Sequence, residues 1–132
     1  ETKSPINTLN ISVSRNDDES VRHRYCRFSI YHAVGRRETG TVIQNDVDNR
    51  RMANTIVVQV TTTLHRSLEK TQLLIDPTHV DWAASGLLRP SVINCSNIYT
   101  IRQSDVARVV GALSKVTMQE VDACLRVALD IA

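Results

Sequence analysis

The residues best suited to chemistry are threonine hydroxyls and arginines. Three consecutive threonines, Thr61, Thr62 and Thr63, end the most β-prone stretch of the chain, and His65 and Arg66 follow closely. A hydroxyl at a strand end can donate a hydrogen bond to a phosphate, and arginine offers a planar, permanently charged fork to phosphate oxygens. The same residue types are also common on an edge strand and a solvated surface, so composition leaves both interpretations open.

Arginines are concentrated in the first part of the chain, although the formal net charge is only +2. They are Arg15, Arg22, Arg24, Arg27, Arg36, Arg37, Arg50 and Arg51. A polar cluster of Asn45, Asp46, Asn49 and Arg50 lies just before the Thr-rich strand and is typical of a turn. This distribution is compatible with phosphate binding and equally with a solvated, arginine-rich surface.

Short β-prone segments dominate the chain up to residue 101 and are separated by turn residues. The patterns predict strands over residues 24–34, 41–44, 55–63, 71–75, 91–95 and 98–101. Residues 35–40 and 45–51 are expected to be loops, residues 76–86 a loop with one helical turn near Trp82, and Ser96-Asn97 a turn.

The last part of the chain has helical signals. Ser104-Asp105 can cap a short helix ending near Leu113, with Val106, Val109 and Val110 at helical spacing. Thr117 and Glu120 form a capping box, Val116 and Val121 fit a hydrophobic staple, and an apolar stripe continues to Leu129. We therefore expect a helix over residues 117–132 that serves core packing or a dimer interface. Several strands followed by a helix predict an α+β fold with a small antiparallel barrel.

A length of 132 residues allows one domain, which we assign to residues 21–132, with residues 1–20 as a flexible or atypical segment. Cys26, Cys95 and Cys124 form no metal-binding or disulfide pattern, so we expect reduced thiols. No generic catalytic motif, metal-ligand spacing or membrane span is visible. We therefore predict a soluble, cytoplasmic protein without metal or cofactor, whose scattered histidines are surface or loop residues.

Four segments, in unbroken order over residues 42–132, resemble one known family. They are VIQNDVDNRRMANTIVVQVTTT, LEKTQLLID, SGLLRPSVINCSNIYTI and VGALSKVTMQEVDACLRVALDI. The first is similar to the V-I-x-N-D, N-R and strand-end threonine of the MazF/PemK-type endoribonuclease toxins. The others resemble the following strand, the "GL…S.V.C.QI.TI" segment and the closing helix of that family.

The resemblance implies an SH3-like antiparallel barrel with a C-terminal helix, the CcdB/MazF-like fold. It also implies a homodimer that cleaves single-stranded RNA at short motifs without metal and is inhibited by a cognate antitoxin. Thr61 corresponds to the family's strand-end threonine. If the family's RNA contacts carry over, they fall on Asn45, Asp46, Asn49, Arg50, Thr62, Thr63, His65 and Arg66.

The arginine of the family's site is where this sequence departs. Family members read R-P just before V-I-x-N-D, whereas here the loop GRRETG runs through Thr41 into VIQND. Arg37 or Arg36 can take over the role, the site can be inactive, or the residues before about 40 can come from a rearranged gene. Function therefore has three alternatives: an endoribonuclease using Thr61 with Arg37 or Arg36, an inactive relative that binds RNA or antitoxin, and a gyrase-poisoning toxin of the same fold. The V-I-x-N-D and strand-end threonine pattern favours the first.

Overall fold

The computed structural model describes residues 26–31 and 37–132. Its elements are β1 (Cys26–Tyr31), β2 (Arg37–Val42), α2 (Asp46–Arg51), β3 (Asn54–Thr61), β4 (Gln72–Ile75), α3 (Trp82–Ser85), β5 (Ser91–Arg102), η2 (Gln103–Asp105), β6 (Val106–Ala112) and α4 (Lys115–Leu129). Residues 1–20, which we expected to be a flexible or atypical segment, lie outside the described residues. The candidate arginine Arg36 also lies outside them.

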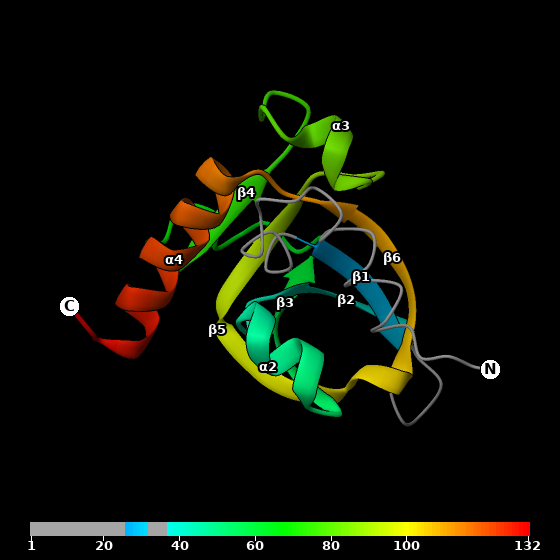
Figure 1. Cartoon of the computed structure of the whole chain (residues 1–132). Helices are drawn as coiled ribbons and strands as arrows, with labels where there is room; N and C mark the ends of the chain where they lie inside the picture. The colour runs from blue at the N-terminus through cyan, green and yellow to red at the C-terminus, as the bar shows by residue number, and fades with distance from the viewer. Residues whose placement is uncertain (1–25, 32–36) are drawn as a thin grey trace.

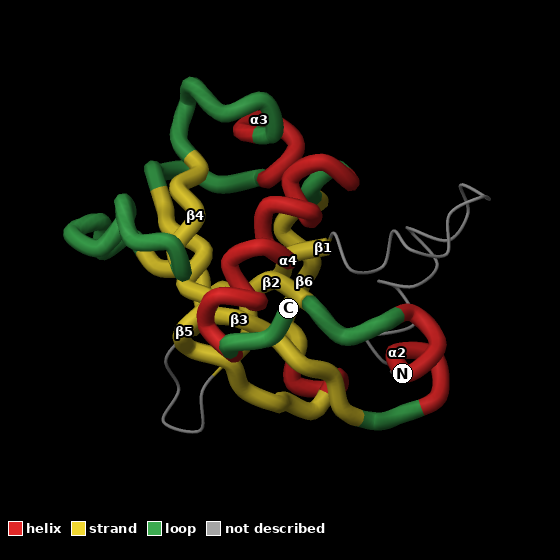
Figure 2. The backbone as a smooth tube through the Cα atoms, turned by 90° about the vertical axis from the view of Figure 1, so that its left-hand side faces the viewer, coloured by secondary structure: helices red, strands yellow, loops and turns green. Residues whose placement is uncertain are grey.

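All the described strands belong to one antiparallel sheet with the order β4-β5-β3-β2-β1-β6. The sheet curls strongly, α4 lies along one side, and α2 and α3 lie at opposite ends of the molecule (Figure 1 and Figure 2). The predicted α+β fold with a C-terminal helix is therefore confirmed. The strand order within the described residues is linear from β4 to β6, so the predicted barrel is better described as a curled open sheet.

Two apolar clusters occupy the two faces of this sheet. The larger lies between the sheet and α4 and includes Val58, Val60, Ile75, Ile93, Cys95, Leu113, Met118, Val121 and Cys124. The smaller lies within the curl and contains Val42, Val57 and Val106, with Tyr99, Ile101 and Val109 packed against them. Both described thiols, Cys95 and Cys124, are free. Alternation along β3 explains the division, because successive side chains of a strand point to opposite faces.

The predicted helix over residues 104–113 is wrong. Only Gln103–Asp105 forms a helical turn, and Val106–Ala112 is the edge strand β6, paired with β1. The pairing skips Ala107, since Ser29 lies opposite Arg108 and Ile30 opposite Val106. This bulge brings Val106 and Val109 to the same face, so a strand acquires the three-residue apolar spacing of a helix.

Two of the predicted loops and one predicted turn are regular structure. Residues 45–51 form α2, because the Asn45 side chain accepts from the backbone N–H of Asp48 at 2.8 Å and caps a helix instead of closing a turn. The predicted loop 35–40 contains the start of β2, which ends at Val42 and not at Gln44. Ser96-Asn97 is part of β5, where residues 95–97 bulge out because Gln59 pairs with Asn94 and Val58 with Ile98.

The C-terminal helix is confirmed, but it starts earlier than predicted. Ser114 is the N-cap and accepts from the N–H of Thr117 at 3.3 Å, while Thr117 itself is fully buried. Val116 is 62% exposed, so the predicted capping box and staple do not form. The N–H of Ser114 donates to Asp81 at 2.7 Å. Burial acts to raise the pKa of Asp81, but hydrogen bonds from Thr117 and Ser114 outweigh it and hold the pKa below its ordinary value.

The other predicted elements are confirmed with small shifts of their bounds. The Thr-rich strand is β3, residues 72–75 form β4, and α3 supplies the helical turn at Trp82. Gly86 ends α3 with φ 74°, in the left-handed region that glycine adopts without strain.

Candidate functional site

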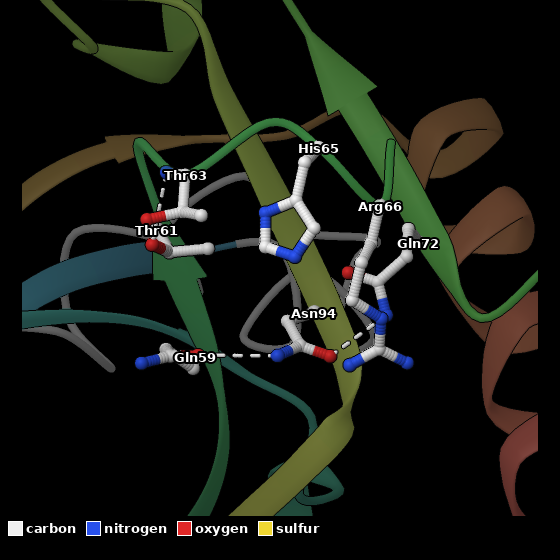
Figure 3. A pocket seen from close by; sticks show the side chains of 7 residues that line it. All are labelled: Gln59, Thr61, Thr63, His65, Arg66, Gln72 and Asn94. Carbon is white, nitrogen blue, oxygen red and sulfur yellow. Dashed lines mark hydrogen bonds between the residues drawn. The ribbon is translucent and has the colours of Figure 1, made fainter. Parts of the chain in front are cut away.

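A polar pocket of about 320 Å³ opens where β3 ends. Its lining comes from β3, the loop after it, β4 and β5 (Figure 3). The residues are Gln59, Thr61, Thr63, His65, Arg66, Gln72 and Asn94. Four of the residues singled out in the sequence therefore meet here, and the volume is at the lower end of the range for small-ligand sites.

Thr61 is the last residue of β3 and is half-buried in this pocket. Its hydroxyl oxygen accepts from the backbone N–H of Thr63 at 3.1 Å. A hydroxyl has one hydrogen to donate as well as lone pairs to accept with. The Thr63 contact therefore fixes the oxygen while leaving its hydrogen available to a ligand.

His65 and Arg66 lie on the loop that follows β3, and both are exposed. The Nε and Nη2 of Arg66 both donate to one Glu69 oxygen, at 2.9 and 2.8 Å. This hydrogen bond raises the pKa of Arg66 and lowers the pKa of Glu69. Because both partners are exposed, the pair contributes little to stability, but it orients the guanidinium at the pocket rim.

Three side-chain amides form the floor of the pocket. The Nε2 of Gln72 donates to the Oδ1 of Asn94 at 2.8 Å, and the Nδ2 of Asn94 donates to the Oε1 of Gln59 at 3.2 Å. Figure 3 shows this series crossing three neighbouring strands, β4, β5 and β3. We call Gln59, Asn94 and Gln72 the amide ladder.

A second hollow, of about 400 Å³, lies on the other face of the end of β3. Val60 and Thr62 line it, whereas the alternate residues Gln59 and Thr61 line the first pocket. It also contains Arg89 and Arg108, both exposed. The end of β3 therefore separates a pocket of amides and hydroxyls from a hollow with two guanidinium groups.

The other predicted RNA-contacting residues, on α2 and its cap, lie at the opposite end of β3. At ~3.3 Å per residue, the eight residues of β3 separate the two ends by ~23 Å. Asn45 and Arg50 are exposed, and Asp46 is 6% exposed. Asn49 is 1% exposed and bonds to Gln44 and Thr55 at 2.6–3.0 Å, so it is built into the fold.

The candidate arginines precede β2 or open it. Arg37 is the first residue of β2 and lies opposite Tyr31 in β1. Two residues later, Thr39 pairs with Val60, the neighbour of Thr61. The backbone of Arg37 is therefore at the same end of the sheet as Thr61. Arg36 lies outside the described residues.

Sequence reasoning missed Gln59, Gln72, Asn94, Arg89 and Arg108. Gln59 could have been found, because it lies two residues before Thr61 and its side chain therefore points to the same face of the strand. The others had no local signal, since they reach the site only through the pairing of β5 with β3 and β4 and the position of β6.

Among residues 26–31 and 37–132, no group of three or more His, Cys, Asp or Glu side chains could hold a metal ion. No helix within the same ranges is both long and apolar enough to cross a membrane.

Comparisons with known proteins agree with this architecture. An endoribonuclease from Mycobacterial species, solved in complex with its cognate antitoxin, is 23% identical with a TM-score of 0.68, over 83% of this chain and 95% of that one. The Mycobacterium tuberculosis toxin MazF-mt6 is 23% identical with a TM-score of 0.69, over 83% and 99%. A Deinococcus radiodurans MazE-MazF structure is 13% identical with a TM-score of 0.62, over 83% and 94%. These likenesses show the fold.

By sequence, no curated protein matches the chain significantly. The family model for the PemK-like, MazF-like toxins of type II toxin-antitoxin systems matches residues 32–129, most of the chain. The chain therefore belongs to the PemK/MazF-like toxins, a family of endoribonucleases.

Proposed function

We propose that this protein cleaves single-stranded RNA at specific sites and without a metal ion, with Thr61 in the catalytic centre. The observation that supports this best is the position of Thr61. Its hydroxyl is held at the end of β3, between a pocket that suits a nucleobase and a hollow that suits phosphates. An RNA strand crossing this strand end would present its backbone to the threonine.

The proposed chemistry needs few groups, because RNA supplies its own nucleophile. The 2′-OH attacks the neighbouring phosphorus, the bond to the 5′-oxygen breaks, and the products are a 2′,3′-cyclic phosphate and a 5′-OH. The enzyme must orient the phosphate and stabilise the charge that develops on its oxygens. Thr61 donates one hydrogen bond, and Arg37 or Arg36 supplies the positive charge.

Arg89 and Arg108 have a supporting role in this proposal. Both line the hollow beside Thr62, on the other face of the strand from Thr61. Guanidinium groups bind phosphate oxygens strongly but carry no sequence information. We assign them to a phosphate that flanks the scissile one, together with the hydroxyl of Thr62.

Catalytically impaired binding of RNA or antitoxin is the second candidate, and one observation favours it. In the described part of the chain, the arginine that lines the Thr61 pocket is Arg66, and Glu69 already accepts from it twice. If neither Arg37 nor Arg36 reaches the phosphate, the pocket can hold RNA without the charge that cleavage requires.

The proposed partners follow the family. One related structure contains a cognate antitoxin, and we propose that an antitoxin segment binds this chain and competes with RNA. We also propose a homodimer, to which α4 can contribute Val116, Val127 and Leu129, each at least 49% exposed. An RNA target of this kind places the proposed activity in the cytoplasm.

The test is incubation of the purified protein with a long, defined single-stranded RNA in EDTA, followed by mapping of the new 5′ ends. We expect discrete cuts with 5′-OH ends. Thr61→Ala should reduce the cleavage rate about 100-fold, the usual effect of removing one transition-state donor, while binding changes little. Thr100→Ala, an exposed threonine on β5 outside both pockets, is the matched control.

Arg37→Ala and Arg36→Ala then identify the cationic group. Loss of the same cuts in one variant assigns the role to that arginine. Salt-sensitive RNA binding by a folded protein that makes no cuts would contradict the cleavage proposal and support the second candidate. Equal rates for Thr61→Ala and the parent would remove Thr61 from the mechanism.

A further inference from the structure

We propose that the amide ladder reads a keto nucleobase, uracil or guanine, through the free Nε2 of Gln59. This inference rests on the proposed function, because it assigns a base preference to the same RNA site. Its basis is the hydrogen-bond polarity of Gln59, Asn94 and Gln72, together with the space beside Gln59.

A backbone group fixes the polarity of the ladder. The N–H of Ser96 donates to the Oδ1 of Asn94 at 3.0 Å, and a backbone N–H can only donate. If the side-chain amide of Asn94 were rotated by 180°, its Nδ2 would face the N–H of Ser96, and two donors would meet. Its oxygen must also accept from the Nε2 of Gln72, so its nitrogen faces Gln59.

Gln59 consequently has one possible orientation within the ladder. Its Oε1 accepts from Asn94, and its Nε2 is turned away from β5, as Figure 3 shows. No partner for this nitrogen exists among the described residues, and the half-buried side chain lines the pocket. The free end of the ladder therefore offers hydrogen-bond donors.

The strand on the other side of Gln59 places no side chain opposite the amide. Gly40 lies directly opposite Gln59 in β2, and it has no side chain to cover the amide. A Cβ at Gly40 would lie 3.2 Å from both the Cβ of Val57 and the carbonyl oxygen of Val58. A side chain at position 40 would thus crowd β3.

The four bases present different hydrogen-bonding groups, so a free donor at Gln59 should favour some bases over others. Uracil has the O4 acceptor that thymine presents in DNA, and guanine presents the O6 acceptor. Adenine and cytosine carry exocyclic amino donors at the equivalent positions. A free glutamine can read adenine with its oxygen and nitrogen together, but here the oxygen is held by Asn94. A donor facing an amino group is penalised, so the pocket should reject adenine and cytosine.

Two variants test the polarity in different ways. Gln59→Glu keeps the acceptor for Asn94 and changes the free end from a donor to an acceptor. Asn94→Asp keeps the oxygen that Ser96 and Gln72 use but removes the Nδ2 that Gln59 needs. In Asn94→Asp, Gln59 should rotate so that its Nε2 faces the new carboxylate and its Oε1 faces the ligand. Asn94 is thus a positioning residue.

The readout is base enrichment and not overall activity. A single-stranded RNA library with randomised positions is bound to each protein in a Thr61→Ala background, and the retained RNAs are sequenced. The parent should enrich uracil or guanine at one position. Both variants should shift the keto-to-amino ratio there by about tenfold toward adenine and cytosine, the cost of one mismatched hydrogen bond.

Matched controls separate polarity from charge. Asn97→Asp and Gln119→Glu make the same chemical changes at exposed positions outside the pocket. They should weaken RNA binding slightly through added negative charge and leave the base ratio unchanged. Thermal unfolding of each variant establishes that it remains folded.

The outcomes distinguish this inference from the proposed function. Keto enrichment that switches in both variants supports base reading even if the parent protein makes no cuts. Specific cutting by the parent, with a base preference that neither variant changes, overturns the ladder's role and leaves the ribonuclease proposal intact. A parent that shows no keto preference at any position also overturns it.

Discussion

The molecule contains two networks of side-chain amides, one at each end of β3, and they differ in what they leave unsatisfied. At the start of the strand, Gln44, Asn49 and Gln103 are at most 7% exposed and bond inward, and the Oε1 of Gln103, which has no hydrogen-bond partner among the described residues, is buried. At the other end, the amide ladder lines an open pocket and has a free donor. The same functional group therefore serves the fold in one place and remains available to a ligand in the other.

The enclosed network has a definite structural task. The Nε2 of Gln103 donates to the carbonyl oxygens of Asn49, Met52 and Asn54, at 3.0, 2.8 and 3.2 Å. Carbonyls at the end of a helix have no partner within the helix, so Gln103 supplies one for α2. The comparison teaches that access to an open pocket, and not residue type, separates ligand-binding amides from structural ones.

The largest effect we expect is on the enclosed network. Asn49→Ala removes three hydrogen bonds and leaves the hydroxyl of Thr55 and the backbone carbonyl oxygen of Gln44 without a buried partner, whereas the Nε2 of Gln44 keeps its bond to the carbonyl oxygen of Asn54. Each such group costs ~1–3 kcal/mol, so we expect a loss of ~3 kcal/mol in the free energy of unfolding, measured with urea. Asn97→Ala, at an exposed position, is the control. A loss below ~1 kcal/mol would mean that the enclosed network is dispensable, and the comparison would fail.

An effect of intermediate size on the free energy of unfolding is expected when the pH is lowered, at a site outside both amide networks. Neither amide network contains an ionisable group, so the pH dependence expected here is that of Asp81. Burial acts to raise the pKa of Asp81, but hydrogen bonds from Thr117 and Ser114 hold it below its ordinary value. A depressed carboxylate pKa stabilises the fold above the unfolded-state pKa, and this contribution disappears as the pH falls through the folded-state pKa. Asp81→Asn should lower stability by ~1 kcal/mol at pH 7, and the difference should shrink below about pH 4. Urea titrations of both proteins at several pH values measure it. A difference that is constant from pH 7 to pH 3 would exclude this assignment.

The smallest effect on stability should come from the ladder. Gln59→Ala removes one 3.2 Å hydrogen bond at a half-buried position, so the free energy of unfolding should change by less than ~1 kcal/mol. RNA binding by the same variant should lose its base preference. Measuring Gln59→Ala and Asn49→Ala by both chemical denaturation and RNA selection compares the two variants directly. If Gln59→Ala destabilised the protein as much as Asn49→Ala, the ladder would belong to the core.

The sequence predicted elements with a strong local period better than those set by pairing. The valines and threonines of β3 and the stripe of α4 were placed correctly because their patterns reflect burial on one face. β6 was misread because the bulge at Ala107 gives a strand the spacing of a helix. α2 was misread because Asn45 can cap a helix or close a turn with the same side-chain amide oxygen, and composition does not choose between them.

Part of the candidate site could be predicted from the sequence, but the part that depends on strand pairing could not. Thr61, Thr63, His65 and Arg66 follow one another closely, so one segment was enough to predict them. Asn94 reaches Gln59 through a bulged pairing of β5 with β3, and no single-sequence pattern gives the register of strands that are far apart in the chain. The ladder therefore became visible only in three dimensions.

The place of β1 in the sheet has a kinetic consequence. β1 comes first among the described strands, yet one of its two neighbours is β6, the last of them. Contacts between distant segments form slowly, because a long loop must close before the pairing repays its entropy. During synthesis, β6 can join the sheet only after nearly the whole domain has left the ribosome. We therefore expect the nascent toxin to remain incompletely folded until β6 has been synthesised and can pair with β1.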